Sequence, residues 1–155
     1  MQTKRPELLV GAGDWKMLTT AVNAGADAVY FGVEELNMRA KANNFEMDKL
    51  DEVVAFCHEN NVDAHLTVNA IVFDDQTDKL DNLLLAAKKA KADMIIAWDM
   101  AVIDKALEYN LPLCISTQAS ISNISAAKAY QRMGADRIVL AREVTLENIK
   151  KIMSY

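Results

Sequence analysis

The sequence predicts a parallel α/β protein made of repeated βα units, and three observations carry this prediction. First, a short phrase recurs along the chain, as Gly25-Ala26-Asp27, Lys91-Ala92-Asp93 and Gly134-Ala135-Asp136. Second, each copy follows a segment with the periodicity of an amphipathic helix, and glycine suits the left-handed conformation that ends a helix. Third, each copy precedes a short apolar run, which is typical of a parallel strand buried on both faces.

The apolar runs predict strands at residues 7–10, 28–31, 64–70, 94–97, 113–117 and 138–141. Amphipathic patterns between them predict helices after Asp14, at 48–60, from 75 through 87, at 101–109, before Gly134 and from Thr145 to the end. We expect Asp14 and Thr145 to cap their helices, and Ser122 or Ser125 to cap the fifth helix. This pattern fits a single domain over residues 1–155, without a linker.

Two architectures satisfy this order: a doubly wound sheet, or six of the eight units of a (β/α)8 barrel. A dinucleotide-binding sheet should have a third small residue in its first turn, where this chain has Lys16. Two strands instead carry polar residues at alternating positions, His65, Thr67 and Asn69 in one and Cys114, Ser116 and Gln118 in the other. Polar side chains stepping toward the end of a strand suit a barrel mouth. We therefore predict a partial TIM-type barrel.

Candidate site residues lie where the strands end, because both architectures bind ligands at that edge. Amides there can donate and accept hydrogen bonds, and an arginine fork suits a carboxylate or phosphate. The loop at 34–45 is long for a βα connection and contains a basic and polar run, so it joins the candidates. The substrate-binding candidates are Asn69, Asp99, Gln118, Arg142, Glu143 and Arg39. The competing structural interpretation is that Asn69 and Gln118 satisfy loop backbone while Arg142 pairs with Glu143 or Asp99.

The sequence gives little support for nucleophilic catalysis or for metal binding. Cys57 and His58 are adjacent on a predicted helix and point about 100° apart, so they cannot act as a nucleophile and its base. His65 is expected to be a hydrogen-bonded core histidine. No metal-ligand cluster is visible, and the two cysteines are expected to be buried thiols. A net charge of −5 argues against a duplex-binding surface, and no apolar stretch predicts a leader or a membrane span, so we expect a cytoplasmic protein.

Taken together, several phrases resemble peptidase family U32, the collagenase-like proteases. They occur in the family's order and cover essentially the whole chain: Pro6-Glu7-Leu8-Leu9, residues 23–32, Arg39-Ala40-Lys41-Ala42-Asn43-Asn44-Phe45, Thr67-Val68-Asn69, Ser116-Thr117-Gln118-Ala119-Ser120 and Arg137-Ile138-Val139-Leu140-Ala141-Arg142-Glu143. One departure is Gly11, where the family often has proline.

The resemblance implies a barrel whose members are designated proteases, several of which act in hydroxylation of RNA bases or of a quinone precursor. It also implies a cysteine-rich signature beyond residue 155, which binds an iron–sulfur cluster in several members. We therefore expect the N-terminal part of a longer protein, with no cofactor bound by these residues and no peptidase activity on their own. The alternative is a non-catalytic binding or assembly module that pairs with another copy or a separate C-terminal chain. Open strand edges favour a homo-oligomer, and the substrate could be peptide or RNA.

Overall fold

The computed structural model describes residues 5–34, 36–38 and 44–154, and these form one sheet of six parallel strands. The order in the sheet is β1-β2-β3-β4-β5-β6, so each strand pairs with its neighbour in the chain. This order confirms the partial barrel and excludes a doubly wound sheet, which would reverse direction at a switch point. The strands are β1 (Leu9–Gly11), β2 (Ala28–Phe31), β3 (Asp63–Thr67), β4 (Met94–Ala97), β5 (Leu113–Ile115) and β6 (Arg137–Ile138).

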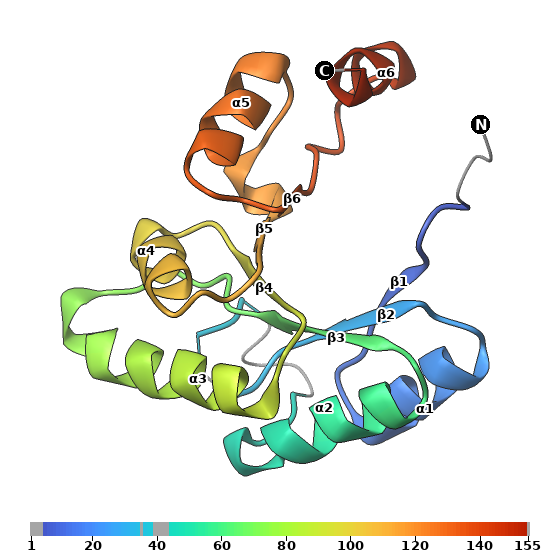
Figure 1. Ribbon diagram of the computed structural model, residues 1–155, viewed down its shortest axis with the longest axis vertical. Coiled ribbons are helices and arrows are strands. Elements are labelled where there is room, and N and C mark those ends of the chain that lie inside the picture. The colour runs from blue at the N-terminus through green and yellow to red at the C-terminus, as the bar shows by residue number, and fades with distance from the viewer. Residues whose placement is uncertain (1–4, 35, 39–43, 155) are drawn as a thin grey trace.

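Helices follow the strands in alternation. They are α1 (Trp15–Asn23), α2 (Leu50–Glu59), α3 (Thr77–Ala90), α4 (Met100–Glu108), α5 (Ile124–Arg132) and α6 (Leu146–Met153), with short 3-10 turns η1 (Met47–Lys49), η2 (Asp74–Gln76) and η3 (Thr117–Ala119). Helices α1 to α4 lie along one side of the sheet, whereas α5 and α6 stand together at its far end (Figure 1). None of the described helices combines the length and the apolar character needed to cross a bilayer.

The two faces of the sheet carry different cores, because successive residues of a strand point in opposite directions. The larger core lies between the strands and the helices, where Ile95 and Phe31 pack with residues such as Leu84. A smaller cluster lies on the inner face and consists of Met94, Ile96 and Cys114, with Tyr30 and Val139 against it. The inner face is the one that a barrel would enclose, and it holds the site described below.

The recurring aspartate performs the same task in each copy. Asp27 Oδ2 accepts a hydrogen bond from the backbone N–H of Leu8 at 2.8 Å, just before β1. Asp93 Oδ2 accepts from Ala64 in β3 at 2.7 Å, and Asp136 Oδ2 accepts from Leu113 in β5 at 2.8 Å. Each aspartate thus lies just before one strand and binds the start of the preceding strand, so it links β1 to β2, β3 to β4 or β5 to β6. We call these three residues the aspartate clips.

The helix before each aspartate clip ends at a residue in the left-handed backbone conformation, as expected. Gly25 has φ +86° and Gly134 has φ +102°, while Lys91 takes the same region at φ +62° in the copy that lacks glycine. An L-residue is strained there, and the surrounding structure has to hold it.

Several expected boundaries and one cap were wrong. The strands β3 and β5 end at Thr67 and Ile115, and β6 covers only Arg137–Ile138. After β6, Val139 and Leu140 line the mouth of the barrel. The fifth helix is capped by Asn123, whose Oδ1 accepts from Ala126 N–H at 2.9 Å, and not by Ser122 or Ser125. Asp14 and Thr145 cap α1 and α6 as predicted.

Candidate functional site

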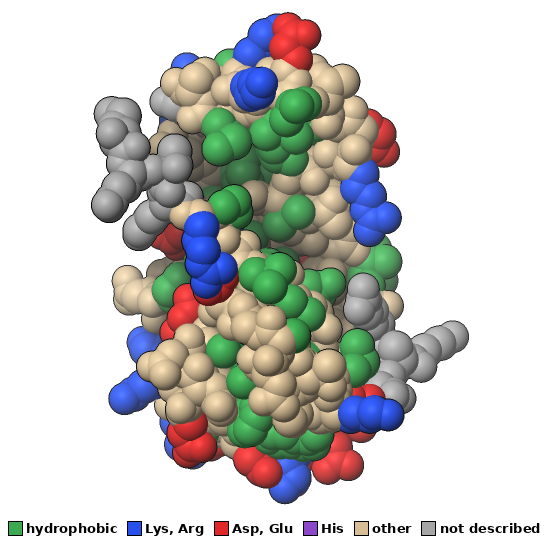
Figure 2. Space-filling model, turned by 90° about the vertical axis from the view of Figure 1, so that its right-hand side faces the viewer, with side chains coloured by type: hydrophobic (Ala, Val, Ile, Leu, Met, Phe, Trp, Pro, Cys, Tyr) green, Lys and Arg blue, Asp and Glu red, His purple; other side chains and the backbone are tan. Residues whose placement is uncertain are grey.

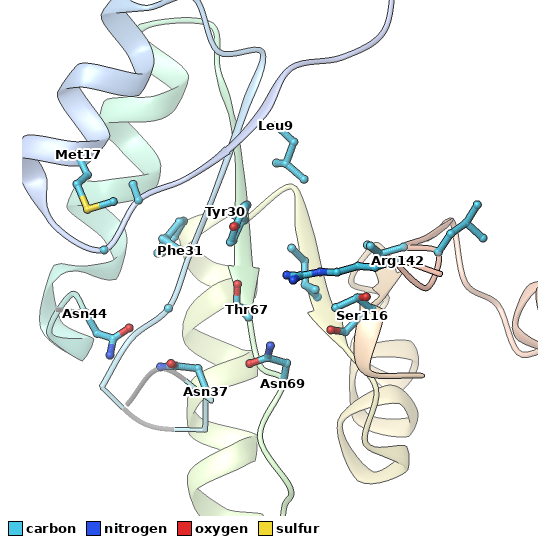
Figure 3. A pocket seen from close by; sticks show the side chains of 17 residues that line it. Leu9, Met17, Tyr30, Phe31, Asn37, Asn44, Thr67, Asn69, Ser116 and Arg142 are labelled. Carbon is cyan, nitrogen blue, oxygen red and sulfur yellow. The ribbon is translucent and has the colours of Figure 1, made fainter. Parts of the chain in front are cut away.

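A pocket of about 580 Å³ opens on the inner face, at the edge where the parallel strands end. This volume lies within the range of about 300–1,000 Å³ that is common for small-molecule sites. Figure 2 shows the hollow crossing one face of the molecule, with hydrophobic side chains along it. Figure 3 shows the residues that line it, most of which come from the strands or from the loops that follow them, with Met17 from α1.

The apolar part of the pocket is made by inward side chains of the strands. Leu9, Tyr30, Ile96 and Val139 line it. Tyr30 lies against the backbone of Gly11, where an added Cβ would come within 2.6 Å of the ring carbon Cζ. Glycine at this position therefore leaves room for the Tyr30 ring.

Amide side chains line the opposite part, next to the loop after β2. A Cβ on Gly32 would lie 2.8 Å from Asn37 Cγ and 3.0 Å from Asn44 Oδ1, so both amides pack over bare backbone. Asn37 is buried, and its Nδ2 donates to the carbonyl of Val33. Asn69, after β3, accepts from the N–H of Met38 at 3.1 Å through Oδ1. Its Nδ2 makes no hydrogen bond with the described residues and is available to a ligand.

Arg142 supplies the charge of the pocket. Its side chain extends from the loop after β6 toward the centre of the site (Figure 3). No hydrogen bond or ion pair joins it to any residue that the structure describes, so the expected alternative of a pair with Glu143 or Asp99 does not occur. The hydroxyl of Thr67 also lines the pocket, and its buried Oγ1 has no partner. The guanidinium of Arg142 and the Nδ2 of Asn69 are thus without a partner among the described residues and can bind one molecule.

The other candidates lie elsewhere. Asp99 caps α4 by accepting from the N–H of Ala101, and it accepts a second hydrogen bond from the N–H of Val72, so its role is structural, although a capping role was not predicted for it from the sequence. Gln118 lies beside the pocket, where its Oε1 accepts from the Ser116 hydroxyl at 3.1 Å and its Nε2 contacts Met38 Sδ. Glu143 is exposed on the same loop as Arg142. Arg39 lies outside the described residues.

The nucleophilic side chains are not activated. Cys57 belongs to the outer core and Cys114 to the inner cluster, and burial raises the pKa of each thiol to about 11. Thiols on opposite faces of a sheet cannot contribute to one iron–sulfur cluster, which needs about four thiolates in one place. Among the described residues, no group of three His, Cys, Asp or Glu side chains is arranged to hold a metal ion.

His65 is buried on the inner face, as expected, but its Nδ1 lacks the hydrogen bond that we predicted. Burial lowers the pKa of its imidazole, and the positive charge of Arg137 lowers it further. The side chain is therefore a neutral base beneath the pocket and does not line it.

Sequence reasoning missed Tyr30, Thr67, Asn37 and Asn44 as lining residues. The side chains of Tyr30 and Thr67 point to the inner face of the sheet, as those of His65 and Asn69 do, so the alternation of side chains along a strand could have identified them. Asn37 and Asn44 belong to the loop at 34–45, and only their packing over Gly32 distinguishes them from its other polar residues.

The fold and the pocket define the class of protein: an open α/β barrel with a substrate-type site at the carboxyl ends of its strands. The model of peptidase family U32 matches residues 13–155, and the chain belongs to this family.

Two curated relatives show what the family contains. The chain is 40% identical over 147 residues to a collagenase of Porphyromonas gingivalis, with 94% of this chain and 35% of the relative covered. It is 35% identical over 152 residues to the tRNA hydroxylation protein P1 of Bacillus subtilis, with 97% of this chain and 36% of the relative covered. The chain therefore spans about a third of the length of these relatives.

A solved structure supports the fold. The U32 peptidase Mk0906 superposes with a TM-score of 0.76 at 16% identity, covering 99% of this chain and 66% of the other. At this identity the likeness concerns the fold alone.

Proposed function

We propose that this chain forms the nucleotide-binding wall of a base-modifying family U32 protein, and that it hydrolyses no peptide. The observation that carries the proposal is the pocket, in which Arg142, which has no partner among the described residues, faces neutral hydrogen-bonding groups across an apolar floor. An unstacked nucleotide offers the same combination: a charged phosphate, a flat apolar surface and a polar base edge.

Each part of the pocket suits one part of this ligand. The guanidinium of Arg142 can bind a phosphate through two parallel hydrogen bonds. Amides such as Asn69 can pair with a base edge, which presents donors and acceptors side by side. The ring of Tyr30 offers a surface for stacking, which proteins use widely for single-stranded nucleic acid. The names of relatives such as the tRNA hydroxylation protein of Bacillus subtilis agree with this ligand class.

A peptidase is less well supported by the described residues. The Ser116 hydroxyl donates to a neutral amide, and no histidine or carboxylate is hydrogen bonded to it. The thiols keep their protons at neutral pH because their pKa values are raised to about 11. A nucleophilic mechanism needs a base within hydrogen-bond reach of the nucleophile. The proposal places the protein in the cytoplasm, where such thiols stay reduced.

The test is binding of a fluorescein-labelled single-stranded RNA octamer, measured by fluorescence anisotropy. Arg142→Ala should weaken binding about tenfold, since a charge-assisted contact contributes about 1.5 kcal/mol. Asn69→Ala should weaken it less, about threefold. Arg132→Ala is the matched control, because Arg132 ends α5 and does not line the pocket.

Two outcomes would overturn the proposal. Equal affinity of the Arg142→Ala variant and the wild type would show that Arg142 does not bind a phosphate of the RNA. Competition by gelatin peptides but not by unlabelled RNA, or peptide turnover that survives repurification, would favour the peptidase.

A second candidate, an assembly module, rests on the exposed apolar surface of α6. Leu146 is 67% exposed and Met153 is 79% exposed, and β1 and β6 are edge strands of the sheet. A second copy of the chain could cover these groups and the strand edges together. Light scattering at high micromolar concentration decides this: a dimer supports the module, and a monomer rules it out.

A further inference from the structure

Glu7 and Arg137 form an ion pair that joins the two ends of the sheet. Arg137 Nη1 lies 2.5 Å from Glu7 Oε1, and Nη2 lies 3.0 Å from Oε2, so the contact is bidentate. Arg137 opens β6, and Glu7 lies two residues before β1. These two strands are at opposite ends of the sheet and share no ladder hydrogen bond. The contact therefore connects parts of the barrel that the backbone does not.

The pair lies directly beneath the pocket. Leu9 and Val139 both line the pocket, Leu9 from β1 and Val139 from the residue directly after β6. Glu7 precedes Leu9 by two residues and Arg137 precedes Val139 by two, so all four side chains share the inward parity of their strands. The ion pair thus joins β1 and β6 one layer of side chains below Leu9 and Val139, which line the pocket.

We distinguish two walls of the pocket: the β1 wall, which includes Leu9, and the β6 wall, which consists of β6 and the loop that carries Arg142. The β6 wall has few other attachments. Strand β6 has only two residues, both half-buried, and it pairs with β5 alone. The helix α5 buries only Ala127, and α6 buries no residue. Packing therefore holds this wall weakly, and a bidentate arginine–carboxylate contact is well suited to fix its position.

We propose that Glu7 and Arg137 are positioning residues that set the distance between the β1 and β6 walls, and through it the place of Arg142 over the bound phosphate. The inference rests on the proposed nucleotide site for its functional part. The hydrogen bond from Arg137 also lowers the pKa of Glu7, so the carboxyl group is charged at neutral pH and the pair stays intact.

The experiment measures the wall distance directly. Nitroxide labels on Lys16→Cys in α1 and Lys150→Cys in α6 report the separation of the two walls by pulsed electron resonance. Both positions are exposed, and the native thiols are buried and keep their protons, so they stay unlabelled. We expect one narrow distance distribution with Glu7 and Arg137 intact, and a broader, longer one in Glu7→Gln.

The variants separate this pair from a general effect of charge. Glu147→Gln is the matched control, since it removes an equal charge from an ion pair within α6, where Glu147 lies 2.7 Å from Lys151. It should leave the distances unchanged. The exchange of both charges, Glu7→Arg with Arg137→Glu, should restore the narrow distribution. Arg137→Lys keeps the charge and loses the fork, so it should give an intermediate width and serves if Glu7→Gln does not fold.

Affinity for the RNA octamer completes the test. Glu7→Gln should weaken it about fivefold, the factor that corresponds to about 1 kcal/mol. Arg142→Ala should weaken it without changing the distances. Unchanged distances in Glu7→Gln, or no recovery in the charge exchange, would overturn the positioning role. If Arg142→Ala leaves RNA binding intact, the nucleotide site is wrong, while the distances still decide whether the pair sets the walls.

Discussion

The first four units and the last two differ in how they are held together. In the first part, α2 and α3 each bury four side chains against the sheet, and every residue of β4 is buried. In the last part, α5 buries one side chain, α6 buries none, and β6 is two half-buried residues long. Packing thus stabilises the first part, whereas caps and ion pairs hold the second. The pocket spans both, with its amides on the packed part and Arg142 on the other.

The sharpest test of this contrast compares two leucines on the helices. Leu84 of α3 is fully buried, and Leu84→Ala should lower the free energy of unfolding by about 2–5 kcal/mol. Leu146 of α6 is 67% exposed, and Leu146→Ala should change it by less than about 0.5 kcal/mol. Urea denaturation followed by circular dichroism measures both. Equal losses would show that α6 is packed as firmly as α3.

The aspartate clips allow the same substitution, aspartate to alanine, to be compared in the first and the second part of the molecule. Asp93 is half-buried and also accepts from His58 Nε2 at 2.8 Å, so Asp93→Ala should cost about 1–3 kcal/mol. Asp136 is exposed, and water can replace its carboxylate, so Asp136→Ala should cost about 0.5–1 kcal/mol. The same urea experiment ranks them. The reverse order would mean that the second part depends on its clip more than the first.

The pH dependence of stability reports on His65, which belongs to the packed part but lies near Arg137 of the other. Its pKa is lowered in the folded protein from an ordinary value of 6.5, first by burial and then by Arg137. Below about pH 6.5 the unfolded chain takes up a proton that the folded chain does not. Stability should therefore be complete above that pH and fall on acidification, by at most about 1.4 kcal/mol per pH unit. His65→Leu should flatten the plot of unfolding free energy against pH between pH 6.5 and 5. If the plots of the variant and the wild type are parallel, groups other than His65 cause the loss of stability.

The smallest effect concerns the two thiols. Both have pKa values near 11 and are buried, so neither should react with a disulfide reagent at pH 8 until the structure opens. Cys114 pairs with Arg137 in the ladder and should become accessible when β6 detaches, whereas Cys57 needs opening of α2. In single-thiol variants, Cys114 should react a few times faster. Equal rates would indicate that the chain opens as one unit.

Much of the fold could be predicted from the sequence, because strong local patterns determine it. The apolar runs, the residues Asp14 and Thr145 as caps, and Gly25 and Gly134 as helix ends all act within a few residues of themselves. Strand ends were less predictable, since an apolar residue such as Leu140 can continue a ladder or turn to line a pocket, and its sequence is the same in both cases.

The site was predictable only in part. Asn69 lies two residues after β3 and Arg142 four residues after β6, close enough to the strand ends for their place at the edge to be predicted, and both line the pocket. Asp99 also follows a strand but caps a helix, because its backbone enters α4 at once. The Glu7–Arg137 pair joins residues 130 positions apart, and only the curvature of the whole sheet brings them together.

The aspartate clips have a consequence for how the chain folds. Each clip decides the pairing of two strands that are separated by a single helix, so no clip depends on the far end of the sheet. Parallel sheets are slow to form when their pairings are distant in sequence, because the loop entropy is lost before contacts form. Here the pairings are as short-range as parallel strands permit. Folding can then proceed from one βα unit to the next, as in a repeat array, without waiting for a ring to close.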